Sequence, residues 1–99
     1  MSSYARYPSL QDRGVLITGG ATGIGETLVE AFAAQGAKVA FIDLAADEGN
    51  ALAARLAGSR HAPQFMAADL SNVGSLRADI AALRERTGPF TVLLNNAAN

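Results

Sequence analysis

The sequence contains no cysteine and no tryptophan, and only 6% of its 99 residues are aromatic. Without cysteine, disulfides and thiolate metal sites are excluded, and no metal site is predicted. Lys38 is the only lysine, and with a net charge of −1 the chain lacks the basic patch that nucleic acid or an anionic membrane would attract. No apolar run reaches the roughly 18 to 20 residues that span a bilayer, and the first residues do not read as a secretory signal. We therefore expect one small cytoplasmic domain.

The residues that are present alternate between short apolar runs and amphipathic periods. Strands are predicted over residues 14–18, 38–44, 64–68 and 91–94, and helices over 24–35, 47–56 and 75–86. Strands alternating with helices of this length imply an α/β fold with a parallel sheet and right-handed crossovers. The chain ends at Asn99, five residues after its fourth predicted strand, where a parallel sheet would still need covering, so the sequence predicts a domain truncated at its C-terminus.

A glycine-rich turn links the first predicted strand to the first predicted helix. Its pattern is Thr18-Gly19-x-x-x-Gly23-x-Gly25, which differs from the general G-x-G-x-x-G spacing. The match to a P-loop fails because Glu26 stands where the lysine that neutralises phosphate should be, so triphosphate hydrolysis is excluded. A plain turn needs fewer glycines, and a strand–turn–helix with this composition favours binding of a pyrophosphate at the helix N-terminus.

A single carboxylate, Asp43, closes the second predicted strand at about the distance from the glycine turn expected of a ribose-binding acid. An isolated aspartate after a strand is more often a helix N-cap or a turn residue, so the spacing from the glycine turn decides the interpretation. A carboxylate accepts from both ribose hydroxyls and repels a 2′-phosphate, and Thr22 in the turn offers no cation. The two residues together favour NAD over NADP.

Three motifs in this order resemble the classical short-chain dehydrogenase/reductase family. They are the glycine turn, the pair Asp69-Leu70 after the third predicted strand, and Asn95-Asn96-Ala97-Ala98 at the end of the chain. The resemblance covers nearly the whole chain. One position departs from the family pattern, because Ala98 stands where glycine is usual.

The resemblance implies a Rossmann-type doubly wound sheet with strand order 3-2-1-4, of which residues 1–99 form the N-terminal part. It also implies cofactor-binding roles for eleven residues, in order from the pyrophosphate toward the adenosine: Gly19, Thr22, Gly23, Ile24 and Gly25 around the pyrophosphate, Asp43 on the ribose, Leu44, Asp69 and Leu70 at the adenine, and Asn96 and Ala97 along the adenosine side of the cleft. Asn95 is expected to tie neighbouring strands together.

The same resemblance implies that catalysis belongs to a serine and a Tyr-x-x-x-Lys motif C-terminal to Asn95-Asn96. Neither Tyr4 nor Tyr7 is followed by lysine at that spacing, so no catalytic residue is predicted in this chain, which by itself is expected to be inactive and marginally stable. The parent is expected to be an NAD-dependent dehydrogenase and a homo-oligomer, dimer or tetramer, that transfers hydride to or from an alcohol or carbonyl substrate. The segment Tyr7-Pro8-Ser9-Leu10 and Asn99 resemble sugar 1-dehydrogenases of the family, such as xylose dehydrogenases.

Two alternatives remain open from the residues alone: an S-adenosylmethionine-dependent methyltransferase fragment, which also uses a glycine turn and a strand-end acid, and a non-catalytic nucleotide-binding module. Outside the motifs, His61 is expected to be a solvated surface residue and Met66 to lie in the core. The charged set Arg77, Arg84, Glu85 and Arg86 is expected to form a solvated helix face.

Overall fold

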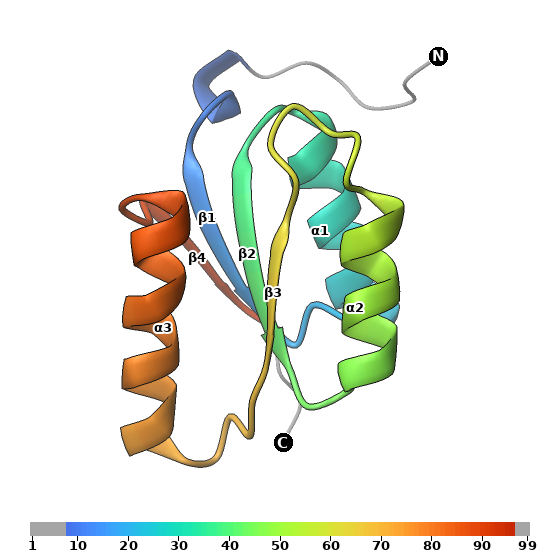
Figure 1. Cartoon of the computed structure of the whole chain (residues 1–99). Coiled ribbons are helices and arrows are strands. Elements are labelled where there is room, and N and C mark those ends of the chain that lie inside the picture. The colour runs from blue at the N-terminus through green and yellow to red at the C-terminus, as the bar shows by residue number, and fades with distance from the viewer. Residues whose placement is uncertain (1–7, 97–99) are drawn as a thin grey trace.

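Four parallel strands form one sheet, with a helix in each crossover (Figure 1). The computed structural model describes residues 8–96 of the chain. In chain order the elements are the 3-10 helix η1 (Pro8–Leu10), β1 (Gly14–Thr18), α1 (Gly23–Ala34), β2 (Lys38–Asp43), α2 (Ala46–Arg55), β3 (Gln64–Ala67), α3 (Val73–Thr87) and β4 (Val92–Asn95). The strand order is β3-β2-β1-β4, which confirms the predicted Rossmann-type topology.

The predicted elements all form, and their ends differ from the prediction by no more than two residues. Helix α3 starts before Ser75 because the side chain of Asn72 accepts a hydrogen bond from the Ser75 amide at 3.2 Å and caps the helix. Strand β4 extends to Asn95 because that residue pairs with Thr18 of β1. Helix α1 ends one residue earlier than predicted, at Ala34, and the predicted Gly36 follows in the left-handed region at φ 80°.

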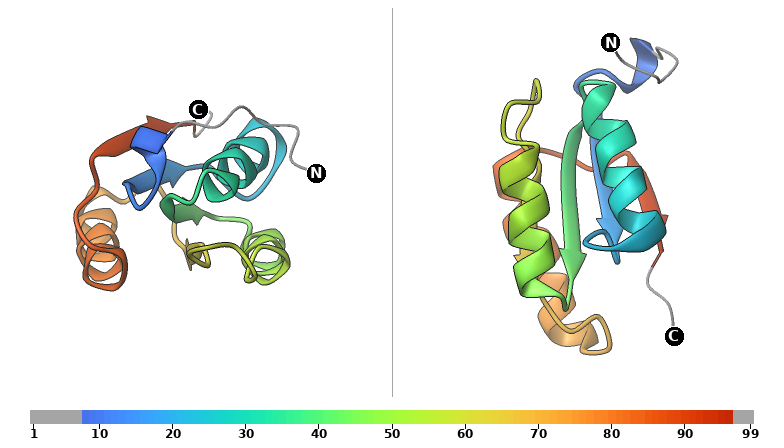
Figure 2. Two further views of the ribbon diagram at one scale, coloured as in Figure 1. Left: turned by 90° about the horizontal axis from the view of Figure 1, so that it is seen from above. Right: turned by 90° about the vertical axis from the view of Figure 1, so that its right-hand side faces the viewer.

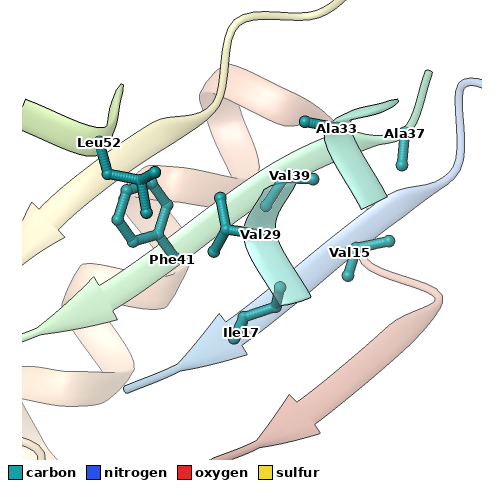
Figure 3. Packing of buried hydrophobic residues seen from close by; sticks show 8 residues of the cluster. All are labelled: Val15, Ile17, Val29, Ala33, Ala37, Val39, Phe41 and Leu52. Atoms are coloured by element: carbon teal, nitrogen blue, oxygen red, sulfur yellow. The ribbon is translucent and has the colours of Figure 1, made fainter. Parts of the chain in front are cut away.

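The helices cover both faces of the sheet: α1 and α2 lie on one face and α3 on the other (Figures 1 and 2). On the first face, residues of β1 and β2 pack against Val29 of α1 and Leu52 of α2, around the fully buried ring of Phe41 (Figure 3). This ring lies 5.0 Å from the ring of Phe65 on β3, measured between centroids. Strand β1 is buried along its whole length, which explains its continuous apolar run.

A second, smaller core fills the other face. Leu16, Ala40 and Ile42 of the sheet contact the fully buried Leu83 of α3. Met66 joins this cluster as a half-buried side chain, so its predicted place in the core is confirmed at the edge of the sheet. No helix within residues 8–96 has both the length and the apolar character to cross a membrane.

His61 lies at the surface, as expected, with 32% of its side chain exposed, but it also makes a contact that the sequence did not predict. Its Nε2 lies 2.6 Å from Oδ1 of Asp12, which also pairs with Arg60. The reason is tertiary: the loop between α2 and β3 returns to the residues just before β1, which are distant in sequence. The helix-face arginines and Glu85 are exposed as expected.

Candidate functional site

The predicted cofactor residues that fall within residues 8–96 lie at the carboxyl end of the sheet, the lower end of the strands in Figure 1. There β1 leads through residues 19–22 into α1, and β2 ends at Asp43. Ligands of open parallel sheets bind at this end, where the strand order reverses between β1 and its two neighbours.

In the glycine turn the backbone at Gly25 lies very close to the backbone at Gly19. Gly19 and Gly23 have φ values of 73° and 60°, which favour glycine. Gly25 is buried, and a β-carbon placed on it would lie 1.8 Å from the carbonyl oxygen of Gly19 and 2.8 Å from Nδ2 of Asn96. Gly20 similarly meets Phe41, whose Cβ would be 2.8 Å away. These glycines are therefore required by the shape of the turn.

The N-terminus of α1 remains available to an anion. Thr22 is the N-cap residue with extended backbone, and its side chain makes no capping hydrogen bond. The first intrahelical bond is donated by the Glu26 amide to the Thr22 carbonyl, so the amides of Gly23, Ile24 and Gly25 precede it. These amides and the helix dipole favour negative charge at this point.

Asp43 is hydrogen-bonded to the turn. Its Oδ2 accepts from the Ala21 amide at 3.1 Å, and its Oδ1 accepts from the Ala45 amide at 3.0 Å. The half-buried carboxylate therefore fixes the turn relative to the end of β2 and keeps a second lone pair on each oxygen for another donor. Sequence reasoning missed the partner Ala21, since a backbone amide carries no signal in the sequence.

Two apolar side chains stand exposed beside these polar groups. Ile24 is 73% exposed and Leu44 is 72% exposed. Each directly follows a predicted site residue, Gly23 and Asp43 respectively. Single exposed apolar residues are common on proteins, but these two flank the glycine turn and the strand-end acid. They could cover the faces of a flat ring.

Asp69 and Leu70 follow β3, the strand next to β2. Oδ1 of Asp69 accepts from both the amide and the hydroxyl of Ser71, at 2.9 and 2.7 Å, and these bonds hold the pKa of Asp69 below its usual value. Asp69 is thus a charged, exposed carboxylate, and Asn72 rather than Asp69 caps α3. Leu70 packs against the α3-side core.

The two asparagines connect β4 to β1. Oδ1 of Asn95 accepts from the Thr18 hydroxyl at 2.8 Å, which supports its expected role in tying the strands together. The Asn96 amide donates to the Thr18 carbonyl, and its Nδ2 donates to the Gly19 carbonyl at 3.1 Å. Asn96 therefore holds the start of the glycine turn. Ala97 and Ala98 lie outside the described residues.

A charge cluster links α1 to α2 next to the turn. Arg55 of α2 contacts the carboxylates of Glu26, at 3.0 Å, and Glu30. Glu26 lies in the first turn of α1, so Arg55 offsets a negative charge near the amides that would bind an anion. The hydrogen bonds to Glu30 and Glu26 raise the pKa of Arg55 above its usual value.

A parallel sheet of this order, with a glycine turn, a strand-end carboxylate and an uncapped helix N-terminus, defines a Rossmann-type nucleotide-binding domain. The chain belongs to the short-chain dehydrogenase family, whose sequence model matches residues 13–99. This membership leaves the methyltransferase alternative without support.

Named relatives and solved structures agree with this assignment. The chain is 50% identical over 95 residues to a probable galactose dehydrogenase of Rhizobium meliloti, covering 95% of this chain and 37% of that protein. It is 45% identical over 97 residues to the D-xylose 1-dehydrogenase of Caulobacter vibrioides, covering 98% and 38%. The chain thus spans less than two fifths of the length of these relatives, and the predicted resemblance to sugar 1-dehydrogenases is confirmed.

Among solved structures, the fold matches FolM alternative dihydrofolate reductase 1 from Brucella canis, complexed with NADP, at a TM-score of 0.78 and 38% identity, covering 88% of this chain and 35% of that one. A short chain dehydrogenase from Bacillus anthracis gives a TM-score of 0.82 at 24% identity, covering 91% and 36%. The second likeness shows the fold alone.

Proposed function

We propose that this chain is the NAD-binding part of a short-chain oxidoreductase that transfers hydride between a nicotinamide cofactor and an alcohol or carbonyl group of a small molecule. The observation that carries the proposal is the bonded unit of glycine turn, Asp43 and Asn96 at the carboxyl end of the sheet. When bound, the nicotinamide supplies the hydride acceptor or donor. The family and the relatives named as dehydrogenases support this activity.

The residues present fit a dinucleotide. A β-carbon on Gly23 would meet no atom within 4 Å, so the space beside this residue is open, next to the first amides of α1. Gly19, Gly23, Ile24 and Gly25 would surround the pyrophosphate, with Thr22 exposed at the rim. A pyrophosphate needs backbone donors and room to approach them, and this turn provides both.

The adenosine half would lie across the ends of β2 and β3. Asp43 would accept from the ribose hydroxyls, with Leu44 beside the adenine and Asn96 along the adenosine side. Asp69 would accept from the adenine amino group, with Leu70 beside it. Ala97, from the same motif as Asn96, completes the proposed set.

Asp43 is also the basis for the proposed preference for NAD. A 2′-phosphate would stand next to this carboxylate, and one pair of unit charges 4 Å apart at an effective dielectric of about 20 costs about 4 kcal/mol. Within the described residues 19–25 no lysine or arginine offsets that repulsion. NAD carries no such phosphate.

We expect the chain to bind NAD at least tenfold more tightly than NADP, as measured by calorimetry. The double variant Asp43→Asn with Thr22→Arg should reduce or reverse this preference. The first substitution removes the charge that repels the 2′-phosphate, and the second adds a cation in the glycine turn. At position 43 asparagine disturbs the turn less than alanine would, since its carbonyl oxygen can still accept a hydrogen bond from the amide of Ala21 or Ala45. Tighter binding of NADP by the unchanged chain would show that the role given to Asp43 is wrong.

A second expectation concerns Gly23. Valine there should lower NAD affinity at least tenfold while the far-UV circular dichroism stays close to that of the parent chain. The side chain would fill the open approach to the α1 amides, and its β-carbon would meet no protein atom within 4 Å. The left-handed backbone at this position adds strain of about 1 to 2 kcal/mol or more for a residue other than glycine. Unchanged NAD affinity would remove the glycine turn from the proposed site.

We propose a sugar as the substrate class, by likeness to the galactose and xylose dehydrogenases. Residues 1–99 contain no Tyr-x-x-x-Lys. The chain alone should therefore form no NADH from NAD with galactose or xylose, monitored by absorbance at about 340 nm, even where it binds the cofactor. Sugar-dependent NADH formation by this chain would show that a different set of residues catalyses the reaction.

A further inference from the structure

A pocket lies at the opposite end of the sheet from the glycine turn. It has a volume of about 420 Å³ and opens between the first residues of β2 and β3, the α2–β3 loop and the last turn of α3. Its polar lining consists of Lys38, Arg60, His61, Gln64, Arg86 and Thr87. This volume falls in the range of pockets that bind small molecules. We refer to it as the amino-end pocket.

The amino-end pocket carries an excess of positive charge. Three of its side chains, those of Lys38, Arg60 and Arg86, are cations at neutral pH. The carboxylate in contact with this set is Asp12, which pairs with Arg60 and His61. Within residues 8–96, neither Lys38 nor Arg86 forms an ion pair. Two positive charges are therefore left for a ligand.

The side chains at one wall of the pocket are held in place. Arg60 donates from Nε and Nη2 to the two oxygens of Asp12, at 2.8 and 3.3 Å. The Asp12 amide in turn donates to the Gly36 carbonyl at 2.8 Å. The hydrogen bonds from Arg60 and His61 hold the pKa of Asp12 well below its usual value, so this arrangement persists at neutral pH. An arginine fixed in this way keeps further N–H donors for a ligand.

The cations could also serve only as counter-charges for the C-terminal end of α3. Among the carbonyl groups of that last turn, the one of Arg84 already has a donor, the Gly88 amide, and the Thr87 hydroxyl donates to Leu83 one turn earlier. Lys38 belongs to β2, where it shares a face with Ala40 and Ile42. Its positive charge is therefore not accounted for by the sequence of α3 or by a need to cap that helix.

We propose that the amino-end pocket binds the phosphoryl group of a small molecule, a dianion that matches its two unpaired positive charges. Lys38 and Arg86 would contact the phosphoryl oxygens, and Arg60 would contribute a donor held by Asp12. This site is separate from the nucleotide site, because Lys38 and Asp43 are the first and last residues of β2, about 17 Å apart along an extended strand.

The test is a titration of the ¹⁵N-labelled chain with inorganic phosphate at constant ionic strength, followed by NMR, with chloride as the reference salt. We expect saturable shifts of the Lys38, Ala62 and Arg86 amides. Arg86→Gln and Lys38→Gln should each weaken binding at least fivefold. Arg77→Gln, on the same helix but outside this pocket, is the matched control and should leave the affinity unchanged.

A parallel titration with glucose 6-phosphate distinguishes the two sources of the phosphoryl group. Binding at least threefold tighter than that of phosphate would indicate a phosphorylated metabolite, and equal binding would indicate free phosphate. Shifts that do not saturate, that appear equally with chloride, or that are confined to Gly23–Gly25 would overturn the proposal. Should a glutamine variant not fold, Arg86→Lys, which keeps the charge, and the map of shifts in the parent chain still decide the matter.

Discussion

Replacing Gly25 by alanine should abolish NAD binding and destabilise the chain by about 1 to 3 kcal/mol or more, the cost of forcing an extra methyl group into a packed site. The new β-carbon would lie 1.8 Å from the Gly19 carbonyl oxygen, so the turn and the first turn of α1 must move apart. That movement also breaks the hydrogen bond between Asn96 and Gly19. Urea denaturation and calorimetry with NAD measure the two effects.

Gly74→Ala is the matched control for this substitution. Gly74 lies in the first turn of α3, where a β-carbon would meet only Oδ1 of Asn72, at 3.8 Å. Alanine there should leave NAD binding unchanged and stabilise the chain by about 0.5 to 1 kcal/mol, because glycine in a helix costs conformational entropy. If Gly25→Ala behaved like Gly74→Ala, the close approach in the glycine turn would not exist in solution.

Phe41→Ala should destabilise the chain by about 3 to 5 kcal/mol, enough to unfold a large fraction of a small domain. The ring is fully buried between α1 and α2 and packs against Phe65, so its removal leaves a cavity at the centre of the core (Figure 3). Phe41 also lies against Gly20, which links the core to the glycine turn. The midpoint of urea denaturation measures the loss.

Leu44→Ala provides the comparison for Phe41→Ala. Leu44 is 72% exposed, so its truncation should change stability by less than about 0.5 kcal/mol. Its proposed place beside the adenine nevertheless predicts weaker NAD binding. A Phe41→Ala chain that kept the stability of the Leu44→Ala chain would show that the core on this face is not packed as described.

The order and type of the elements could be predicted because short apolar runs alternate along the chain with longer stretches in which apolar residues recur every three or four positions. The start of α3 was the least accurate limit, since it depends on the cap at Asn72, and the shift of β4 by one residue depends on the pairing of Asn95 with Thr18. The first limit depends on a hydrogen bond of one side chain, and the second on a strand that is distant in the sequence. The periodicity of apolar residues carries no information on these interactions.

The candidate site divides in the same way. The glycines and Asp43 could be found because they stand at fixed places around a strand and a helix. The amides that Asp43 accepts from, the position of Asn96 on the Gly19 carbonyl, and the contact of His61 with Asp12 could not. Each depends on the conformation of the folded chain, and most of them join segments that only the tertiary fold brings together.

The side-chain hydrogen bonds that join Thr18 to Asn95 and Asn96 to Gly19 have a consequence for folding kinetics. They join residues 77 positions apart, and β4 is the last strand of the described chain. Closing so long a loop is entropically costly and slow compared with forming local helices. The glycine turn therefore reaches its final shape only when β4 docks beside β1, and during refolding the capacity to bind a nucleotide should lag behind the recovery of helical signal.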